Sequence, residues 1–163
     1  MSVSHITRPA LLLLASLCLP GSAVQAAVSS PFAAMAGSWS GGGMLSTTDG
    51  NQERLRCRAS YNIGETGAEL HLSLKCASES YNFDLASDVQ YRGGAISGSW
   101  SEASRNASGT ITGRAAGDRI EAAARGESFS ANLSLTTRGG RQVVSIRPQG
   151  TNISDVSLTL QRR

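Results

Sequence analysis

The sequence predicts an all-β protein: a single antiparallel up-and-down β-barrel of about eight to ten strands, with a short N-terminal helical turn and one disulfide. Three observations support this fold class. Apolar and polar residues alternate with a period of two over many short segments. Turn-forming residues separate these segments at intervals of about 8 to 12 residues, which is typical of sandwiches and barrels. Two cysteines fall on consecutive segments of this kind.

The N-terminal residues have the features of a secretory signal. Arg8 precedes an apolar run over residues 10–19, and the helix-breaking pair Pro20-Gly21 and the small residues of SAVQA follow. The run is shorter than the roughly 20 residues that a membrane-spanning helix needs. We therefore expect cleavage after Ala26, which divides the chain into a signal peptide, residues 1–26, and one β-barrel domain, residues 27–163.

The first strand is expected to follow a short helical turn over residues 30–37, SPFAAMAG, and to contain Trp39. The phrase GSWS around Trp39 recurs around Trp100, and these are the only two tryptophans of the chain. On a strand, Gly37 and Gly41 share a face with Trp39, as Gly98 does with Trp100. A bulky residue beside positions without side chains suits the interior of a tightly curved sheet.

Cys57 and Cys76 are the cysteines that remain once the signal is removed. In an exported chain such an even pair is expected to form a disulfide. Cys18 lies where a lipoprotein signal carries its cysteine, but Leu17 replaces the small residue that such a signal has before it. Two cysteines and one histidine, His71, are too few for a tetrahedral metal site, so we expect no metal and no cofactor.

Residues 53–61 and 69–76 show the clearest strand alternation and predict a hairpin with one buried face. Placing Cys57 opposite Cys76 puts the turn at Thr66-Gly67. A slip of one residue would mix apolar with polar positions, so the pattern and the bridge favour the same register. That register pairs Ala59 with Leu74, Tyr61 with Leu72 and, on the polar face, Arg58 with Lys75.

The same alternation continues toward the C-terminus. It predicts strands within residues 80–86, 95–101, 119–124, 128–135, 141–146 and 155–160. Glycine-containing turn signals separate them, among them Gly93-Gly94, Gly117-Asp118 and Gly139-Gly140. These short segments leave no room for a long helix.

The helical turn that leads into Ala36-Gly37-Ser38-Trp39 resembles the G-x-W entrance of calycin barrels, the lipocalin and avidin group. In that group the tryptophan lies at the closed or packed end of the first strand, and the resemblance implies the same place for Trp39. The later arginine motif of lipocalins and the aromatic-rich binding wall of avidins have no recognisable counterpart in this sequence.

The chain also resembles the small periplasmic and outer-membrane inhibitors of bacterial metalloproteases. They share the G-x-W phrase, a similarly spaced cysteine pair and a small barrel. The distance from Trp39 to Cys57 is longer here than in those inhibitors. The resemblance implies a role that the protein performs through its surface.

Catalysis is disfavoured by the residues available. Nucleophilic catalysis by serine or cysteine usually needs a histidine partner, and His71 lies on the polar face of its strand. Glycines 41–43 lead into no helix, so they do not form a phosphate-binding loop. We expect a protein that is not an enzyme.

Two groups of residues are candidates for binding. The predicted interior gathers aromatic side chains that could surround a small apolar ligand: Trp39, Tyr61, Tyr81, Phe83, Trp100 and Phe129. The alternative for these residues is a packed core, because side chains can fill a barrel of about eight strands. On the outside, Arg56, Arg58 and Lys75 form a basic patch that suits lipid phosphates, lipopolysaccharide or an acidic protein; the alternative is a solvated face.

The sequence thus predicts a non-catalytic exported protein of the bacterial envelope, periplasmic or secreted, that binds a small apolar or lipid-like ligand in a calycin-like barrel. The alternative is a periplasmic protease inhibitor, or an envelope-structural protein that contacts an envelope protein or lipid through its surface. We expect no nucleic-acid partner. We also expect no membrane-spanning role, because the strands are short and no aromatic girdle is present.

Overall fold

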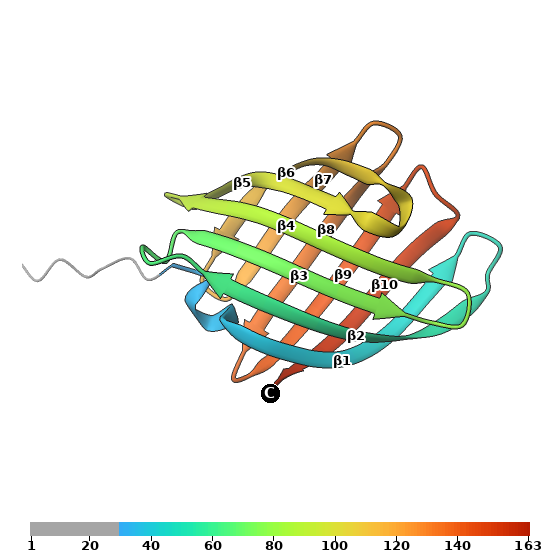
Figure 1. Cartoon of the computed structure of the whole chain (residues 1–163), viewed down its shortest axis with the longest axis horizontal. Coiled ribbons are helices and arrows are strands. Elements are labelled where there is room, and N and C mark those ends of the chain that lie inside the picture. The colour runs from blue at the N-terminus through green and yellow to red at the C-terminus, as the bar shows by residue number, and fades with distance from the viewer. Residues whose placement is uncertain (1–29) are drawn as a thin grey trace, which may run out of the picture.

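Residues 30–163, which the computed structural model describes, form one closed antiparallel barrel of ten strands (Figure 1). The predicted fold class is confirmed, at the upper end of the expected strand number. The predicted signal peptide lies outside the described residues. The strands are β1 (Gly37–Thr47), β2 (Gln52–Ile63), β3 (Glu69–Ala77), β4 (Asn82–Arg92), β5 (Ala95–Glu102), β6 (Ala107–Ala116), β7 (Arg119–Gly126), β8 (Ser130–Arg138), β9 (Arg141–Gln149) and β10 (Ile153–Arg162).

Each strand pairs with the next one along the chain, and β1 pairs with β10 to close the sheet. This order places every turn at one of the two ends of the barrel. The expected helical turn is the short 3₁₀ helix η1 (Ala33–Met35), which lies at the end where β2 turns into β3 (Figure 1). A second 3₁₀ turn, η2 (Ala103–Arg105), lies at the opposite end. We call these the η1 end and the η2 end.

The hairpin of β2 and β3 has the predicted register. Cys57 faces Cys76, Ala59 faces Leu74 and Tyr61 faces Leu72. The Cys57–Cys76 disulfide is present, with Cα atoms 4.1 Å apart. Such a separation fits a non-hydrogen-bonded pair, in which opposing residues of antiparallel strands lie closest. The alternation of apolar and polar residues and the disulfide therefore both agree with the observed register of β2 and β3.

Strand β6 is the strand that the alternation of apolar and polar residues did not predict. Its inward positions carry Ala107, Gly109, Ile111, Gly113 and Ala115, so the apolar face has little bulk. The sequence delimited this segment only by the turn signals on either side. Because one strand is hard to recognise, the strand number could be predicted only as a range.

The interior is apolar and the outer face is polar. The buried residues form a large cluster around Trp39 and a smaller one around Trp100. Within residues 30–163, the large hydrophobic residue exposed to solvent is Val143. This part of the chain contains no helix long and apolar enough to cross a membrane.

Candidate ligand-binding interior

The six aromatic residues predicted to surround a ligand divide between the two ends of the barrel. Trp39 and Tyr61 pack edge to face near the η1 end, with ring centroids 6.3 Å apart. The other four lie toward the η2 end, where Trp100 and Phe129 form a second edge-to-face pair with centroids 5.5 Å apart. The interior therefore has two distinct aromatic groups and not one continuous wall.

Trp39 is part of a packed plug at the η1 end. Its ring is 1% exposed, and its indole Nε1 donates a hydrogen bond to the carbonyl oxygen of Met35 at 2.7 Å. Phe32, just before η1, and Met35, the last residue of η1, are also buried. The short helix thus folds back over the tryptophan, and the predicted calycin-like entrance closes this end of the barrel.

Arg162 covers the outer side of the same plug. Its guanidinium lies 4.9 Å from the centroid of a Trp39 ring, and it also donates to the carbonyl oxygen of Ala34. The later arginine motif of lipocalins has no recognisable counterpart in the sequence; in the structure, Arg162 of β10 lies over the tryptophan. Arg162 reaches Trp39 because β1 pairs with β10 in a register that sets these two residues opposite each other. This pairing exists only in the closed barrel, so the sequence alone did not predict it.

Tyr61 is held by buried hydrogen bonds at this end. Its hydroxyl donates to Gln142 Oε1 at 2.6 Å, and Gln142 Nε2 donates to Thr137 Oγ1 at 3.2 Å. Burial raises the pKa of Tyr61, and the hydrogen bond to Gln142 opposes that effect only in part. Because these polar groups satisfy one another, Tyr61 and Gln142 stabilise the plug and leave no polar group free for a ligand.

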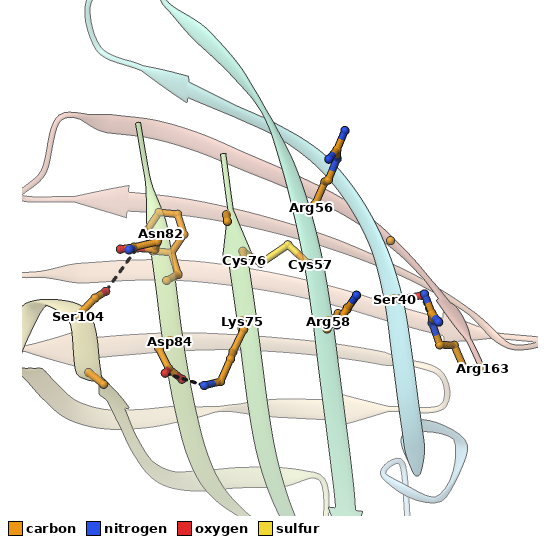
Figure 2. A pocket seen from close by; sticks show the side chains of 14 residues that line it. Ser40, Arg56, Cys57, Arg58, Lys75, Cys76, Asn82, Asp84, Ser104 and Arg163 are labelled. Atoms are coloured by element: carbon orange, nitrogen blue, oxygen red, sulfur yellow. Dashed lines mark hydrogen bonds and ion pairs between the residues drawn. A yellow bond between two sulfur atoms is a disulfide. The ribbon is translucent and has the colours of Figure 1, made fainter. Parts of the chain in front are cut away.

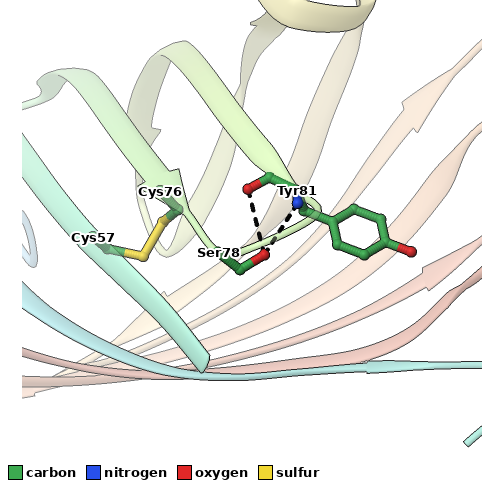
Figure 3. Close-up of a disulfide and its surroundings, with 4 residues drawn as sticks. All are labelled: Cys57, Cys76, Ser78 and Tyr81. Carbon is green, nitrogen blue, oxygen red and sulfur yellow. Dashed lines mark hydrogen bonds between the residues drawn. A yellow bond between two sulfur atoms is a disulfide. The ribbon is translucent and has the colours of Figure 1, made fainter. Parts of the chain in front are cut away.

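Tyr81 and Phe83 lie where β3 turns into β4, at the η2 end. Their rings stack with planes 4° apart, and Asn152 Nδ2 donates to the Tyr81 hydroxyl at 2.7 Å. The backbone N–H of Tyr81 donates to Ser78 Oγ at 3.1 Å, close to the disulfide (Figure 3). These bonds link the β3–β4 and β9–β10 turns and hold the two rings in place.

The second aromatic pair occupies a slot made by glycines. Trp100 lies opposite Gly109 of β6, and Gly109 lies opposite Gly126 of β7. A Cβ atom on Gly126 would come within 3.0 Å of the Trp100 ring, so the indole lies against the backbone of β7. The large-beside-small arrangement predicted from the sequence is therefore present, with glycines on the neighbouring strands as well as on the same strand.

Trp100 differs from Trp39 in one chemical respect. It is 6% exposed, yet its Nε1 has no hydrogen-bond partner within the part of the chain that the structure describes. Leaving a buried donor unpaired costs about 1–3 kcal/mol. Sequence reasoning did not anticipate this, because the two tryptophans share the same local phrase.

Part of the inner wall is less tightly packed than the plug. Several inward-facing apolar residues are only half-buried: Leu72, Leu74, Leu85, Ile111, Leu133, Leu135 and Ile146. Small residues, including Ala122, Ala124 and Ala131, stand between them. Barrel diameter grows with strand number, and about eight strands already leave an interior just wide enough to be filled. The inward residues that are only half-buried show that part of the interior stays accessible to solvent.

Glu102 is a buried carboxylate that the sequence analysis did not single out. Its oxygens accept hydrogen bonds from the backbone N–H groups of Asp84 at 2.9 Å and Arg105 at 2.8 Å, and from Ser104. Burial alone would raise the pKa of Glu102, but these hydrogen bonds outweigh it and lower the pKa. The carboxylate caps η2, so its role in this arrangement is structural.

The predicted basic patch lies on the outside of β2 and β3 (Figure 2). Arg58 pairs in register with Lys75, as predicted, and Arg56 lies two residues along. Together with Arg163 these cations line a shallow groove that crosses β1 to β4. Lys75 Nζ donates to Asp84 Oδ2 at 2.9 Å, so one of the cations is partly neutralised.

His71 has an acidic neighbour but not the geometry of a catalytic triad. Its Nδ1 lies 2.5 Å from Asp88 Oδ1, and both side chains are exposed. Ser99 pairs with Asp88 on the far side from His71, so the order across the sheet is histidine, aspartate, serine. A serine nucleophile must instead contact the imidazole. Among the described residues, no cluster of three or more metal-binding side chains occurs.

Comparison with known proteins shows which solved structures share this fold. No protein-family model and no curated protein matches the sequence. The crystal structure of Rv2717c from M. tuberculosis is similar over 82% of this chain and 97% of that chain, with a TM-score of 0.63 and 14% identity. The S-type phycobiliprotein lyase CPES from Guillardia theta is similar over 81% of this chain and 89% of its own, with a TM-score of 0.61 and 10% identity. The chain therefore shares a calycin-like barrel fold with these structures.

Proposed function

We propose that this protein is a non-catalytic binding protein of the bacterial envelope, exported by its signal peptide, that holds a small apolar or lipid-like ligand inside the barrel. The observation that carries the proposal is the half-buried apolar inner wall of a ten-stranded barrel. A concave apolar wall whose side chains are not fully buried is what a ligand chamber requires.

The composition of the wall favours an apolar ligand. Around Trp100 the apolar inward residues are alanines, leucines, isoleucines and Phe129. Burying apolar surface of the ligand against them contributes roughly 25 cal/mol for each Å² removed from water. The calycin-like fold of the neighbouring structures is compatible with this use of the interior.

Native mass spectrometry of the protein from its own host's periplasm tests the proposal directly. We expect a chain that begins at Ala27 and carries an extra mass that leaves on denaturation. A bare chain that also fails to take up the apolar dye Nile red would contradict ligand binding. A chain that retains residues 1–26 would contradict export by cleavage.

A matched pair of substitutions locates the binding site. Ala122 faces inward on β7, whereas Ala123 beside it faces outward. Ala122→Phe should fill the chamber and abolish Nile red binding, and Ala123→Phe should leave the affinity unchanged. Circular dichroism of both variants checks that the barrel is intact. Equal effects of the two substitutions would place the dye outside the interior.

The groove on the outer face favours a second candidate, a protease inhibitor or envelope-structural protein that contacts an acidic partner or lipid headgroups through its surface. Arg56 and Arg58 are exposed and form no ion pair with any residue that the structure describes. Unpaired cations in a groove attract anionic groups. Removing these charges should abolish such a role and spare the interior.

A further inference from the structure

The two indole N–H groups of the protein differ in how they are satisfied. Trp39 Nε1 donates to the carbonyl oxygen of Met35, and this bond fixes the plug at the η1 end. Trp100 Nε1 is buried without a partner among residues 30–163. Buried polar groups are nearly always hydrogen-bonded, so an orphan donor in a native structure calls for an explanation.

The buried polar side chains of β4 and β5 make hydrogen bonds to groups other than the Trp100 indole. Ser87 Oγ donates to the carbonyl oxygen of Ser99 at 2.9 Å, and the Glu102 oxygens accept from the backbone around η2. The hydrophobic residues packed around Trp100 are Leu85, Ala107, Ile111, Ala124, Phe129, Ala131, Leu133 and Ile146. Arg105, a cation at this end, lies over the Phe83 ring and is paired with Glu102 at 3.4 Å. Among the described residues, the interior near Trp100 thus presents one unused donor beside mainly apolar side chains.

We propose that the ligand is an uncharged, mainly apolar molecule with one hydrogen-bond acceptor, such as a carbonyl oxygen, and that this acceptor binds Trp100 Nε1. The inference rests on the proposed ligand-binding function and adds the chemical class of the ligand. A neutral acceptor satisfies the donor, whereas a carboxylate would bring a charge into a wall without a free cation.

The acceptor reaches the nitrogen by separating the indole from an apolar neighbour, because the Nε1 atom has no accessible surface. Phe129 is the neighbour placed to move. It contacts the indole edge to face and belongs to the β7–β8 turn at the η2 end, just before β8 begins. A ligand that enters from this end meets Phe129 and Trp100 first.

Two probes of the same shape test the inference on the unaltered protein. One is methyl heptyl ketone; the other is the alkene in which a methylene group replaces the carbonyl oxygen. With nitrogen-15 tryptophan, the protein gives two indole N–H signals in an NMR spectrum. We expect the ketone to move the Trp100 indole proton downfield, as hydrogen bonding does, and the alkene not to do so. The Trp39 signal is the internal control, because its partner is Met35.

Substitution of the indole completes the test. Trp100→Phe keeps an aromatic ring and removes the donor. We expect the preference for ketone over alkene to fall roughly 2- to 13-fold in this variant, the factor that corresponds to one neutral hydrogen bond. The NMR measurement stands even if the variant does not fold.

The outcomes separate this inference from the function on which it rests. If both probes bind equally well and leave the Trp100 N–H signal unshifted, an apolar chamber exists but the acceptor contact is wrong. If the ligand-free protein already shows a hydrogen-bonded Trp100 signal, a bound water satisfies the donor and the inference fails. If neither probe binds and Nile red does not bind either, the ligand-binding function itself is wrong.

Discussion

A single glycine on a barrel strand acts by letting the neighbouring backbone come close. Gly98 lies opposite Val89, and a Cβ atom on Gly98 would overlap the backbone oxygen of Asp88. The three nearest atoms are all backbone atoms of β4, so no flexible side chain can move aside. The glycine therefore sets how closely β4 and β5 approach beside Trp100.

Gly98→Ala should accordingly lower the free energy of unfolding by about 1–3 kcal/mol, the usual cost of forcing extra atoms into a packed region. Ser97→Ala, next to it on the outer face, should change stability by less than about 0.5 kcal/mol. Urea unfolding of the two variants measures both values. Equal stability of the two would show that β4 can shift without cost.

Tyr61 connects stability to alkaline pH. Its pKa is raised in the folded protein by burial. A raised folded pKa contributes stability that is fully present below the unfolded pKa of about 10 and is lost as the pH rises above it. The free energy of unfolding should therefore fall by up to about 1.4 kcal/mol per pH unit above pH 10, and less steeply in Tyr61→Phe. Urea unfolding at a series of pH values checks this, and parallel curves for the two proteins would contradict it.

At the scale of elements, the β2–β3 hairpin is the unit best determined by its own sequence. Both strands alternate cleanly, and the disulfide joins directly opposed residues, so local pattern and covalent bond agree. Nineteen residues separate Cys57 from Cys76 along the chain. Closing a loop of that size restricts the unfolded chain and so favours the folded one.

Replacing both cysteines by alanine should lower the free energy of unfolding by about 3 kcal/mol while the barrel stays folded. Reductant should lower the stability of the unaltered protein by a similar amount and leave the double variant unchanged. Urea unfolding with and without reductant measures both effects. A native protein whose cysteines react with an alkylating agent without prior reduction would show that the bridge does not form.

Other elements could not be predicted from local pattern alone. The period of two identified most strands because their inward residues are bulky, but β6 presents glycine and alanine inward and gives a weak signal. The pairing of β1 with β10, which brings Arg162 to Trp39, joins the two ends of the chain and leaves no mark in either segment. Long-range contacts of this kind become visible only in three dimensions.

At the scale of the whole molecule, the candidate site was predicted in composition but not in arrangement. The aromatic residues face inward as expected, yet closure of the barrel separates Trp39 and Tyr61 from Trp100 and Phe129. The two tryptophans share the GSWS phrase but differ in hydrogen bonding. The Trp39 indole donates to Met35 of η1, whereas the Trp100 indole has no acceptor among the described residues. What a side chain can bind depends on which neighbours the closed sheet brings to it.

The inner and outer candidate sites belong to opposite faces of the same wall, so substitutions can separate them. Replacing Arg56, Arg58 and Lys75 by glutamine removes the cations of the outer groove without changing an inward residue. We expect Nile red affinity to stay the same in this variant. Sedimentation with anionic phosphatidylglycerol vesicles measures the surface role, and binding to them should be lost if the groove recognises anionic headgroups.

A matched variant distinguishes a local groove from net charge. Arg114, Arg119 and Arg147 line a second hollow, over β6 to β9. Replacing these three by glutamine removes the same charge at a distance from the first groove. If only the first variant loses vesicle binding, the surface site is local to β1 to β4. Equal losses would reflect general attraction between a basic protein and an anionic surface. Loss of Nile red binding in the first variant alone would place the ligand on the outer face and overturn the chamber as its site.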